Sequence, residues 1–447
     1  MSAVNTSIIN KELSCTSCFG NVLIVGAGPV AINVAVNISN GWCNNIGLVS
    51  RKSFHLTRFK EELKQNNYII KSKAQGEKLS NICGKVKLKY FYEGYNNIDD
   101  IWDTIIMCTP SDSYKDVIND LNVNKLKQIK TIILISPSIG SNLLVNSQLK
   151  IKDKIDVISF SNYYAATKFE SSNLRATCAF TKALKKRIYI SSSKNKSKII
   201  FDVKNFIESF GVQCTIVSNT IEAESKNITT YVHPPFFINE FSLNEILTSR
   251  KSKKYMYKIY PEGPITQHSI RTMLLLWKEI SKFIQYFNAK PINLLKFLND
   301  DNYPVHEITI SREDIENFME LDEIKQQYLL YIRYSAILID PFSIPDENGK
   351  YFDFSAVPYK QVYKDENGKL IIPRIPFEDY KKLKLIYNLA KKINIDMPQT
   401  LELIKIFEKK LNEYINREGK HSFNKDIFID KICDEVDDIF NEMERKK

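Results

Sequence analysis

The segment NVLIVGAGPVAINVAVNI, residues 21–38, limits the fold more than any other part of the sequence. A short apolar run leads into Gly26, Gly28 and Ala31, which have the spacing G-x-G-x-x-A, and apolar residues then recur as in a helix. The first glycine allows a tight turn, the second lets the backbone approach a pyrophosphate, and the small third residue packs the helix on the strand. The segment therefore predicts a strand, a turn and a helix whose N-terminus binds a dinucleotide. The predicted contacts are Gly26, Gly28, Pro29, Val30 and Ala31.

The next predicted strand, IGLVS, indicates which dinucleotide is bound. It ends at Ser50, where an Asp or Glu would hold the two ribose hydroxyls of NAD. The chain continues instead with Arg51 and Ser53, and a cation with hydroxyl groups suits a 2′-phosphate. We therefore expect NADPH, bound through Ser50, Arg51 and Ser53, with a solvated basic turn as the alternative. Thr109 and Pro110, in the segment MCTPSD, are expected to line the same crevice.

Strand-like and helix-like segments alternate through the first half of the chain, which predicts βαβ units and a mostly parallel sheet. Further strands are expected at residues 85–92, 103–108, 131–136, 156–161, 187–191 and 213–218, and helices near 56–65, from Ser113 and within 196–211. Beyond residue 219 long helical patterns follow, at 265–287, 315–339, 378–393 and 400–414.

The predicted fold class is therefore α/β, with an N-terminal Rossmann-type parallel sheet domain and a mainly α-helical C-terminal domain with a small β-hairpin insertion. The expected boundaries are a flexible extension at 1–20, a nucleotide-binding domain at 21–219 and a helical domain at 220–447. Asn348-Gly349 and Asn367-Gly368 mark the hairpin turns.

Composition argues against several other classes of protein. The first twenty residues lack the pattern of a signal peptide, and the apolar run near the start is broken by glycines, so we expect a soluble, cytoplasmic protein. Eight scattered cysteines indicate reduced thiols, and Cys15 and Cys18 form a single C-x-x-C with no second pair. The net charge of +11 is spread over the chain, which predicts no nucleic-acid groove and suits anionic ligands.

The segment TTYVHPPFFINEFS, residues 229–242, contains His233 followed by two prolines. A histidine among aromatic side chains is most often a packed core residue. Pro234 and Pro235, however, remove two backbone donors and are expected to stop a regular helix, which leaves a bend from which an imidazole can project into a cavity. The residues alone leave catalysis and packing open.

Several segments occur in one order along the chain: ILISPSIGSNLLV, YVHPPFFINEFSL, YPEGPIT and YLLYIRYSAILIDPFSIPDENGKYFDFSAVPYKQVYK. Together they resemble the staphylopine and pseudopaline dehydrogenases, the opine dehydrogenases that complete nicotianamine-like metallophores in bacteria. The likeness runs from about residue 21 to residue 376. It implies an NADPH-dependent reductive condensation of a histidine-derived amine, which carries an aminobutyrate unit, with an α-keto acid.

The resemblance also implies particular residues and partners. His233 falls at the catalytic histidine of the family, and the protein is expected to be a homodimer, with Tyr351, Phe352 and Phe354 among candidate interface residues. A nicotianamine-like synthase is the expected pathway neighbour. No metal site is expected in the chain, because the metal ligands belong to the product.

The segment FSNYYAATKF, residues 160–169, departs from the staphylococcal enzymes. Ala166 replaces an acidic residue and Lys168 replaces an arginine. Alanine leaves space without charge beside the keto acid, and Lys168 can attract a second carboxylate. We therefore expect 2-oxoglutarate as substrate and a pseudopaline- or bacillopaline-like product, with pyruvate as the alternative substrate. Neutral drift away from the substrate is the alternative interpretation of these two replacements. Tyr231 is also expected at the substrate site.

Rival functions remain open at this level. They are a simpler opine dehydrogenase, a ketopantoate-type reductase, and a non-enzymatic sensor that binds NADP.

Overall fold

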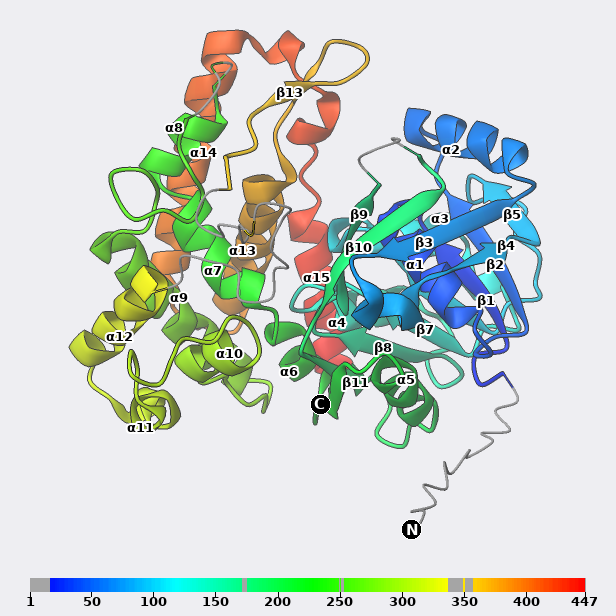
Figure 1. Cartoon of the computed structure of the whole chain (residues 1–447), viewed down its shortest axis with the longest axis horizontal. Coiled ribbons are helices and arrows are strands. Elements are labelled where there is room, and N and C mark those ends of the chain that lie inside the picture. The colour runs from blue at the N-terminus through cyan, green and yellow to red at the C-terminus, as the bar shows by residue number, and fades with distance from the viewer. Residues whose placement is uncertain are drawn as a thin grey trace, which may run out of the picture.

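An eight-stranded sheet with its helices lies at one side of the computed structural model, and a group of helices lies at the other (Figure 1). The structure describes residues 17–170, 175–248, 250, 253–336, 349 and 357–446. Most of the predicted N-terminal extension, Asn348 of the predicted hairpin turn, and Tyr351, Phe352 and Phe354 lie outside the described residues.

The larger sheet carries the nucleotide-binding segment. Its strands are β1 (Asn21–Val25), β2 (Asn45–Ser50), β5 (Tyr90–Glu93), β6 (Thr104–Met107), β7 (Thr131–Leu134), β8 (Asp156–Phe160), β11 (Arg187–Ser192) and β12 (Gln213–Ile216). They lie in the order β12-β11-β8-β7-β6-β1-β2-β5, and neighbours are parallel except β8 and β11. From β1 the chain continues to β2 and β5 on one side of β1, and β6, β7 and β8 then follow on the other side. The sheet therefore has its topological switch point between β1 and β6, where open α/β sheets bind ligands.

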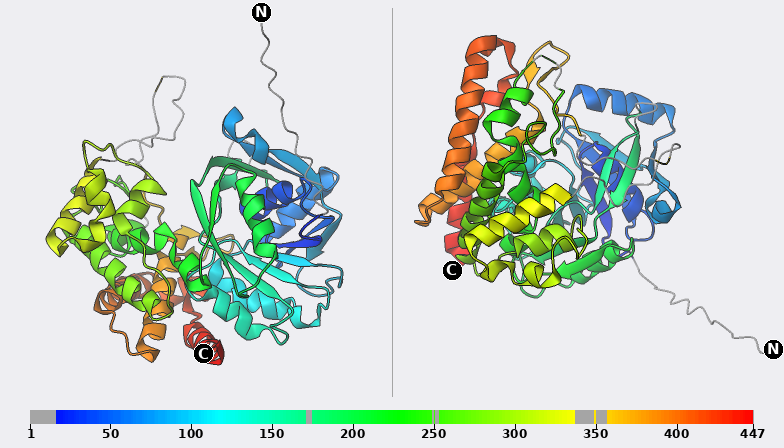
Figure 2. Two further views of the ribbon diagram at one scale, coloured as in Figure 1. Left: turned by 90° about the horizontal axis from the view of Figure 1, so that it is seen from below. Right: turned by 60° about the vertical axis from the view of Figure 1, so that its left-hand side comes forward.

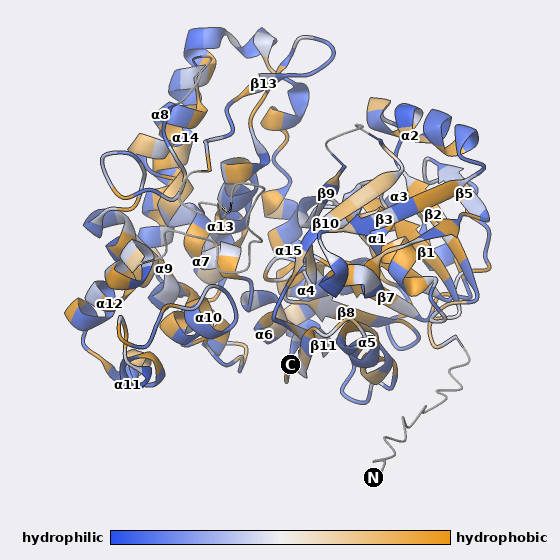
Figure 3. Cartoon of the chain, viewed as in Figure 1, coloured by the Kyte–Doolittle hydropathy of each residue, from blue (hydrophilic) through white to orange (hydrophobic). Residues whose placement is uncertain are grey.

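Helices cover both faces of this sheet, as the predicted alternation requires. They are α1 (Pro29–Ile38), α2 (Phe54–Gln65), α3 (Tyr114–Asp120), α4 (Ser141–Gln148) and α5 (Ile199–Glu208), with short 3-10 turns η1 (Glu77–Ile82), η2 (Ser111–Ser113) and η3 (Val123–Lys125). Apolar residues fill the sheet strands and the inner faces of these helices, and polar residues lie outward, most visibly on α2 (Figure 3).

A second sheet, which the sequence did not predict, packs on the outer side of α1. Its four strands have the order β4 (Gly84–Lys87), β3 (Ile69–Ala74), β10 (Cys178–Leu184) and β9 (Ala165–Phe169). The helix between the two sheets buries Asn33 and Asn37. Asn33 bonds to Ser72 and to the hydroxyl of Tyr163, and the NH₂ group of Asn37 donates to the hydroxyl of Tyr164, so most polar groups of this buried helix face have partners.

The predicted strand at 85–92 is wrong as one element. β4 pairs antiparallel with β3 in the small sheet, and β5 pairs parallel with β2 in the large one. The chain changes direction at Leu88 and Lys89, and Leu88 is buried there. Alternating lysine and apolar residues suit both strands equally, so the pattern did not reveal the crossing from one sheet to the other.

The second half is helical, and the predicted fold class is confirmed. Its helices are α6 (Thr220–Ser225), α7 (Ile228–Phe237), α8 (Glu240–Ile246), α9 (Gln267–Gln285), α10 (Leu294–Asp300), α11 (Arg312–Glu316), α12 (Glu323–Ala336), α13 (Arg374–Lys392), α14 (Pro398–Glu418) and α15 (Ile432–Lys446). The predicted hairpin at Asn367-Gly368 is present as β13 (Tyr363–Lys364) and β14 (Leu370–Ile371). The helix predicted at 315–339 is interrupted, because Asp322 begins a new helix and its carboxylate accepts from Lys325 N.

The last helix returns to the first half of the chain. α15 packs against α4 and α13, and Lys115 of α3 pairs with Asp438 at 2.6 Å. Lys152 also pairs with Glu442. Figure 2 shows α15 at the junction of the two parts. Within the described ranges, no helix is long and apolar enough to cross a membrane.

Candidate functional site

The glycine turn after β1 lies at the switch point of the large sheet. Gly26 has φ +119°, and its N–H donates to Val49 O at 2.8 Å. A Cβ at this position would come within 3.3 Å of Cys108 O at the end of β6. The position therefore needs glycine for its backbone conformation as well as for the approach of β6.

The first turn of α1 has open space in front of it. Gly28 is the N-cap, Pro29 follows it, and no described side chain bonds to the free amides of this turn. A Cβ on Gly28 would meet no described atom within 4 Å. Packing inside the chain thus does not explain this glycine, whereas close approach of a phosphate does.

Thr109 lies beside this turn, directly after β6. Its Oγ1 is buried and has no hydrogen-bond partner among the described residues. A buried hydroxyl without a partner is costly unless a ligand completes it. The donors at the N-terminus of α1 and the hydroxyl of Thr109 therefore fit a dinucleotide laid across the ends of β1 and β6.

The end of β2 places Ser50, Arg51 and Ser53 on the same edge of the sheet. Arg51 is exposed and forms no ion pair with a described residue. The Ser53 side chain accepts from Leu56 N and caps α2, which fixes the turn. His55 follows in the first turn of α2, and its Nε2 lies 2.9 Å from Ala27 O in the glycine turn.

His233 lies inside a helix, and the predicted break at the prolines is wrong. α7 runs from Ile228 to Phe237 and contains both Pro234 and Pro235. The ring fixes φ near the helical value, so a short helix tolerates the two missing amides. The helix is held at its ends, where Asn227 accepts from Thr229 N and where Ile238 N donates to Pro234 O at 2.8 Å.

The imidazole of His233 pairs with a carboxylate from a distant part of the chain. Its Nδ1 lies 3.2 Å from Asp379 Oδ2, and Asp379 lies in α13, which packs against α7. The side chain of His233 is 16% exposed and that of Asp379 is 4% exposed. Phe237 meets the ring edge-on at 5.3 Å. An ionised carboxylate can only accept, so Nδ1 carries the hydrogen and Nε2 remains for proton exchange.

An ion pair connects α13 with the nucleotide-binding edge. Lys381, two residues after Asp379, bonds to Asp112 Oδ2 at 3.0 Å, and Asp112 follows Thr109 by three residues. Burial raises the pKa of the neighbouring Glu378, and Asp112 contributes to the same shift. Helix α13, which carries Asp379, is therefore tied to the segment that follows β6.

The predicted substrate residues lie in different surroundings. Ala166 and Lys168 are exposed on β9, the edge strand of the small sheet. Tyr231 is fully buried, and its hydroxyl donates to Ser225 O at 3.0 Å. In this structure Tyr231 packs α7 against α6 and offers no surface to a substrate.

Two acidic residues of the site region were missed from the sequence. Asp379 carries no local signal, because its partner is 146 residues away. Glu224 is buried in α6 and accepts from Gly140 N and Asn142 N, each at 2.8 Å, and from Ser159 Oγ at 2.9 Å. Its carboxylate thereby caps α4 and ties the first helix after the large sheet to the carboxyl edge of that sheet. The described residues include no group of three or more His, Cys, Asp or Glu side chains that could hold a metal.

Comparison with known proteins extends over nearly the whole chain. The family model for staphylopine dehydrogenase matches residues 20–443. Pseudopaline synthase of Pseudomonas aeruginosa is 40% identical over 412 residues, which cover 92% of this chain and 94% of that protein. Staphylopine synthase of Staphylococcus aureus is 36% identical over 416 residues, covering 91% and 95%. The structure of yersinopine dehydrogenase with NADP⁺ bound has a TM-score of 0.88 at 31% identity, covering 96% of this chain and 100% of that one.

Proposed function

The chain belongs to the staphylopine dehydrogenase family of opine dehydrogenases, and from this premise we propose that it catalyses an NADPH-dependent reductive condensation. The proposed amine substrate is a histidine derivative that carries an aminobutyrate unit. The second substrate is an α-keto acid, and the product is a metal-chelating opine.

The observation that carries the proposal is the His233–Asp379 pair, 3.2 Å apart, on two helices that pack together, of which α13 is tied to Asp112 after β6. The amine adds to the keto carbon, the hydroxyl of the carbinolamine leaves as water, and the resulting imine is reduced. His233 gives a proton from Nε2 to the departing hydroxyl and accepts one at Nε2 from the adding amine. Asp379 holds the ring in one tautomer and stabilises its charged form.

The cofactor is held by the residues that meet at the switch point. The N-terminus of α1 with Gly26 and Gly28 binds the pyrophosphate, the exposed Arg51 with Ser50 and Ser53 binds the 2′-phosphate, and Thr109 donates into the crevice beside Pro110. When bound, the nicotinamide supplies the hydride that reduces the imine carbon. The NADP⁺ complex of yersinopine dehydrogenase supports the choice of NADPH over NADH.

We further propose 2-oxoglutarate as the keto acid. Ala166 is small, exposed and uncharged, so the region leaves room for a second carboxylate and does not repel it. The 40% identity to pseudopaline synthase is consistent with a pseudopaline-like product. Pyruvate is the alternative substrate.

The remaining proposals concern the setting of the enzyme. We place it in the cytoplasm as a homodimer that receives its amine from a nicotianamine-like synthase. The metal ligands belong to the product, so chelators are expected to leave catalysis intact.

The test uses the purified full-length protein with NADPH, the synthetic amine, and either 2-oxoglutarate or pyruvate. Loss of the nicotinamide absorbance that requires both substrates, with a secondary amine identified by mass spectrometry, supports the reaction. A faster reaction with pyruvate contradicts the keto acid assignment alone. Cofactor oxidation that does not require the amine contradicts the condensation itself.

A further inference from the structure

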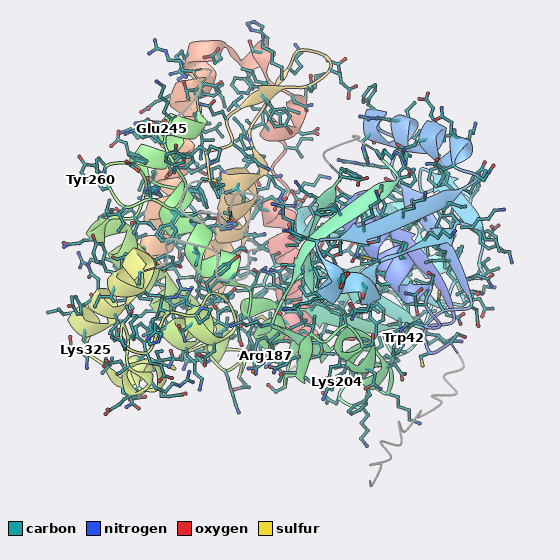
Figure 4. The ribbon with its side chains drawn as sticks, viewed as in Figure 1. Trp42, Arg187, Lys204, Glu245, Tyr260 and Lys325 are labelled. Carbon is teal, nitrogen blue, oxygen red and sulfur yellow. The ribbon has the colours of Figure 1, made fainter. Side chains whose placement is uncertain are left out.

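A pocket lies where the large sheet meets the helical part, at the carboxyl edge of the sheet beside β8 and β11. It encloses about 290 Å³ of empty space, part of it open to solvent. Asn162 follows β8, Lys185 and Arg187 lie at the start of β11, and Ile228 begins α7. Arg187 marks the place in Figure 4, at the lower edge of the sheet beside the helices. The pocket is open to solvent and lined mainly by polar and charged side chains, so it suits a small charged group such as a carboxylate.

The walls of the pocket are cationic. Lys226 and Arg187 line it together with Lys185, and Asp301 is the acidic residue of the lining. Arg187 pairs with Asp301 at 3.5 Å, and Lys226 pairs with Glu222 at 3.5 Å. These two cations are therefore already balanced by carboxylates of the protein.

Lys185 differs from both of them. Its ammonium has no ion pair or side-chain hydrogen bond with any residue in the described ranges. Lys185 is half-buried in the wall of the pocket, and this burial lowers the pKa of its ammonium. A poorly solvated cation without a counter-ion is unfavourable, and an anionic ligand would relieve the cost.

The first turn of α7 also favours an anionic ligand in this pocket. Ile228 is its first residue and lines the pocket, so the positive end of the helix dipole lies at the pocket wall. Asn227 caps only part of the turn, by accepting from Thr229 N at 3.1 Å. A free amide and Lys185 together suit a carboxylate, which accepts from both.

The pocket is within reach of the reacting centre. His233 lies five residues after Ile228 in the same helix, about 7 to 8 Å along its axis. On the other wall, Ala166 of β9 pairs with Ala183 of β10, and the N–H of Lys185 donates to Tyr164 O at 2.8 Å. Lys185 follows Ala183 by two residues, and Ala183 lies opposite Ala166. Lys185 therefore extends from the same strand pair that carries Ala166.

We propose that this pocket is a substrate subsite, in which Lys185 and the N-terminus of α7 bind a carboxylate of one of the two substrates while its reacting group lies at His233. The inference rests on the proposed function and extends it. Both substrates carry carboxylates, and steady-state kinetics tell them apart.

The test compares Lys185→Met with the wild type, using NADPH, the synthetic histidine-derived amine and 2-oxoglutarate. Loss of a charge-assisted contact is expected to raise KM by about 10-fold or more for the substrate whose carboxylate binds there, with a smaller change in kcat. A higher KM for the amine assigns the subsite to the amine, and a higher KM for 2-oxoglutarate assigns it to the keto acid. Lys196→Met is the matched control, because it removes the same charge from an exposed loop beyond the other end of β11.

Lys185→Arg separates charge from packing, because it keeps the charge and is expected to retain most of the affinity. The dissociation constant of NADPH reports whether each variant is folded. Unchanged KM values in Lys185→Met, or equal increases in Lys185→Met and Lys185→Arg, would overturn the subsite. A wild-type protein that does not turn over the amine contradicts the proposed function, whereas an active wild type with an unaffected Lys185→Met variant contradicts this inference alone.

Discussion

The Nδ1 atom of His233 lies 3.2 Å from Oδ2 of Asp379, although the two residues are 146 positions apart in the sequence. His233 belongs to α7, which only the short helix α6 separates from the last strand of the large sheet. Asp379 belongs to α13, which Lys381 ties to Asp112 near the end of β6. The pair therefore connects the nucleotide-binding edge with the helical half. It also gives the imidazole a defined tautomer for proton transfer.

Asp379→Asn tests the role of the carboxylate. The amide keeps the size of the side chain but presents an NH₂ group to the ring, which favours the wrong tautomer. We expect kcat to fall by about 100-fold or more, with unchanged affinity for NADPH. Glu378→Gln is the matched control, because it alters the adjacent carboxyl, which does not bond to His233 among the described contacts. Equal losses in the two variants would show that the effect is a general change of charge.

The sequence predicted the nucleotide-binding half well because its signals are local. The run from Asn21 to Ile38 contains strand, turn and helix within one short segment, and the observed bounds agree with it. The small sheet was missed because its strands come from two separate regions, residues 69–87 and 165–184, and are half polar. Ser72 of this sheet is buried and accepts from Asn33. Without knowledge of this partner, a serine at that position is expected on the surface.

The candidate site was predicted only on the side that carries a motif. His233 stands beside two prolines and was singled out, but its partner Asp379 lies among ordinary helical residues. Only the packing of α13 on α7 brings the two together. The prolines suggested a bend, whereas the helix continues through them because their fixed φ is compatible with its geometry.

Arg51→Ala tests the proposed 2′-phosphate contact. The guanidinium is exposed and has no described ion-pair partner, so its removal leaves no buried charge behind. We expect the dissociation constant of NADPH to rise by about 10-fold and that of NADH to stay the same. Lys52→Ala removes the same charge from the next residue. If both variants weaken NADPH equally, the basic turn acts through its general field and Arg51 makes no specific contact.

Glu224→Ala tests the carboxylate that ties α6 to the sheet. It leaves three donors without their acceptor, namely Gly140 N, Asn142 N and Ser159 Oγ. Buried donors without a partner are costly, and we expect the free energy of unfolding to fall by about 3 to 5 kcal/mol. Ser159→Ala removes only the hydroxyl donor, and it is expected to lower the free energy of unfolding by about 1 kcal/mol. Denaturant unfolding measures both values, and similar losses in the two variants contradict a central role for the carboxylate.

Glu435→Gln tests a pH dependence at the junction between α15 and the first half of the chain. Burial, with the nearby Asp112, raises the pKa of Glu435 from 4.5 to about 7, and Lys115 partly offsets the shift. The folded protein therefore holds this proton more tightly than the unfolded chain does. The free energy of unfolding therefore falls as the pH rises from 4.5 through about 7, and the full loss, about 3 kcal/mol, applies above that range.

We expect Glu435→Gln to have the stability of the wild type near pH 4.5 and to exceed it at pH 8, because the amide has no proton to lose. Denaturant unfolding at the two pH values measures the difference. Asp434→Asn is the control, since it removes an exposed carboxyl from the same helix. A Glu435→Gln variant that is less stable than the wild type at pH 8 would contradict the raised pKa.

The central claim is that His233 transfers protons in a reductive condensation. The direct measurement is the kcat of His233→Ala with NADPH, the histidine-derived amine and 2-oxoglutarate, together with its dissociation constant for NADPH. The account predicts a kcat lower by about 100-fold or more with cofactor affinity unchanged, because the nucleotide binds to the ends of β1, β2 and β6 and not to α7. A His233→Ala variant that turns over at nearly the wild-type rate would show that the imidazole only packs beneath Phe237.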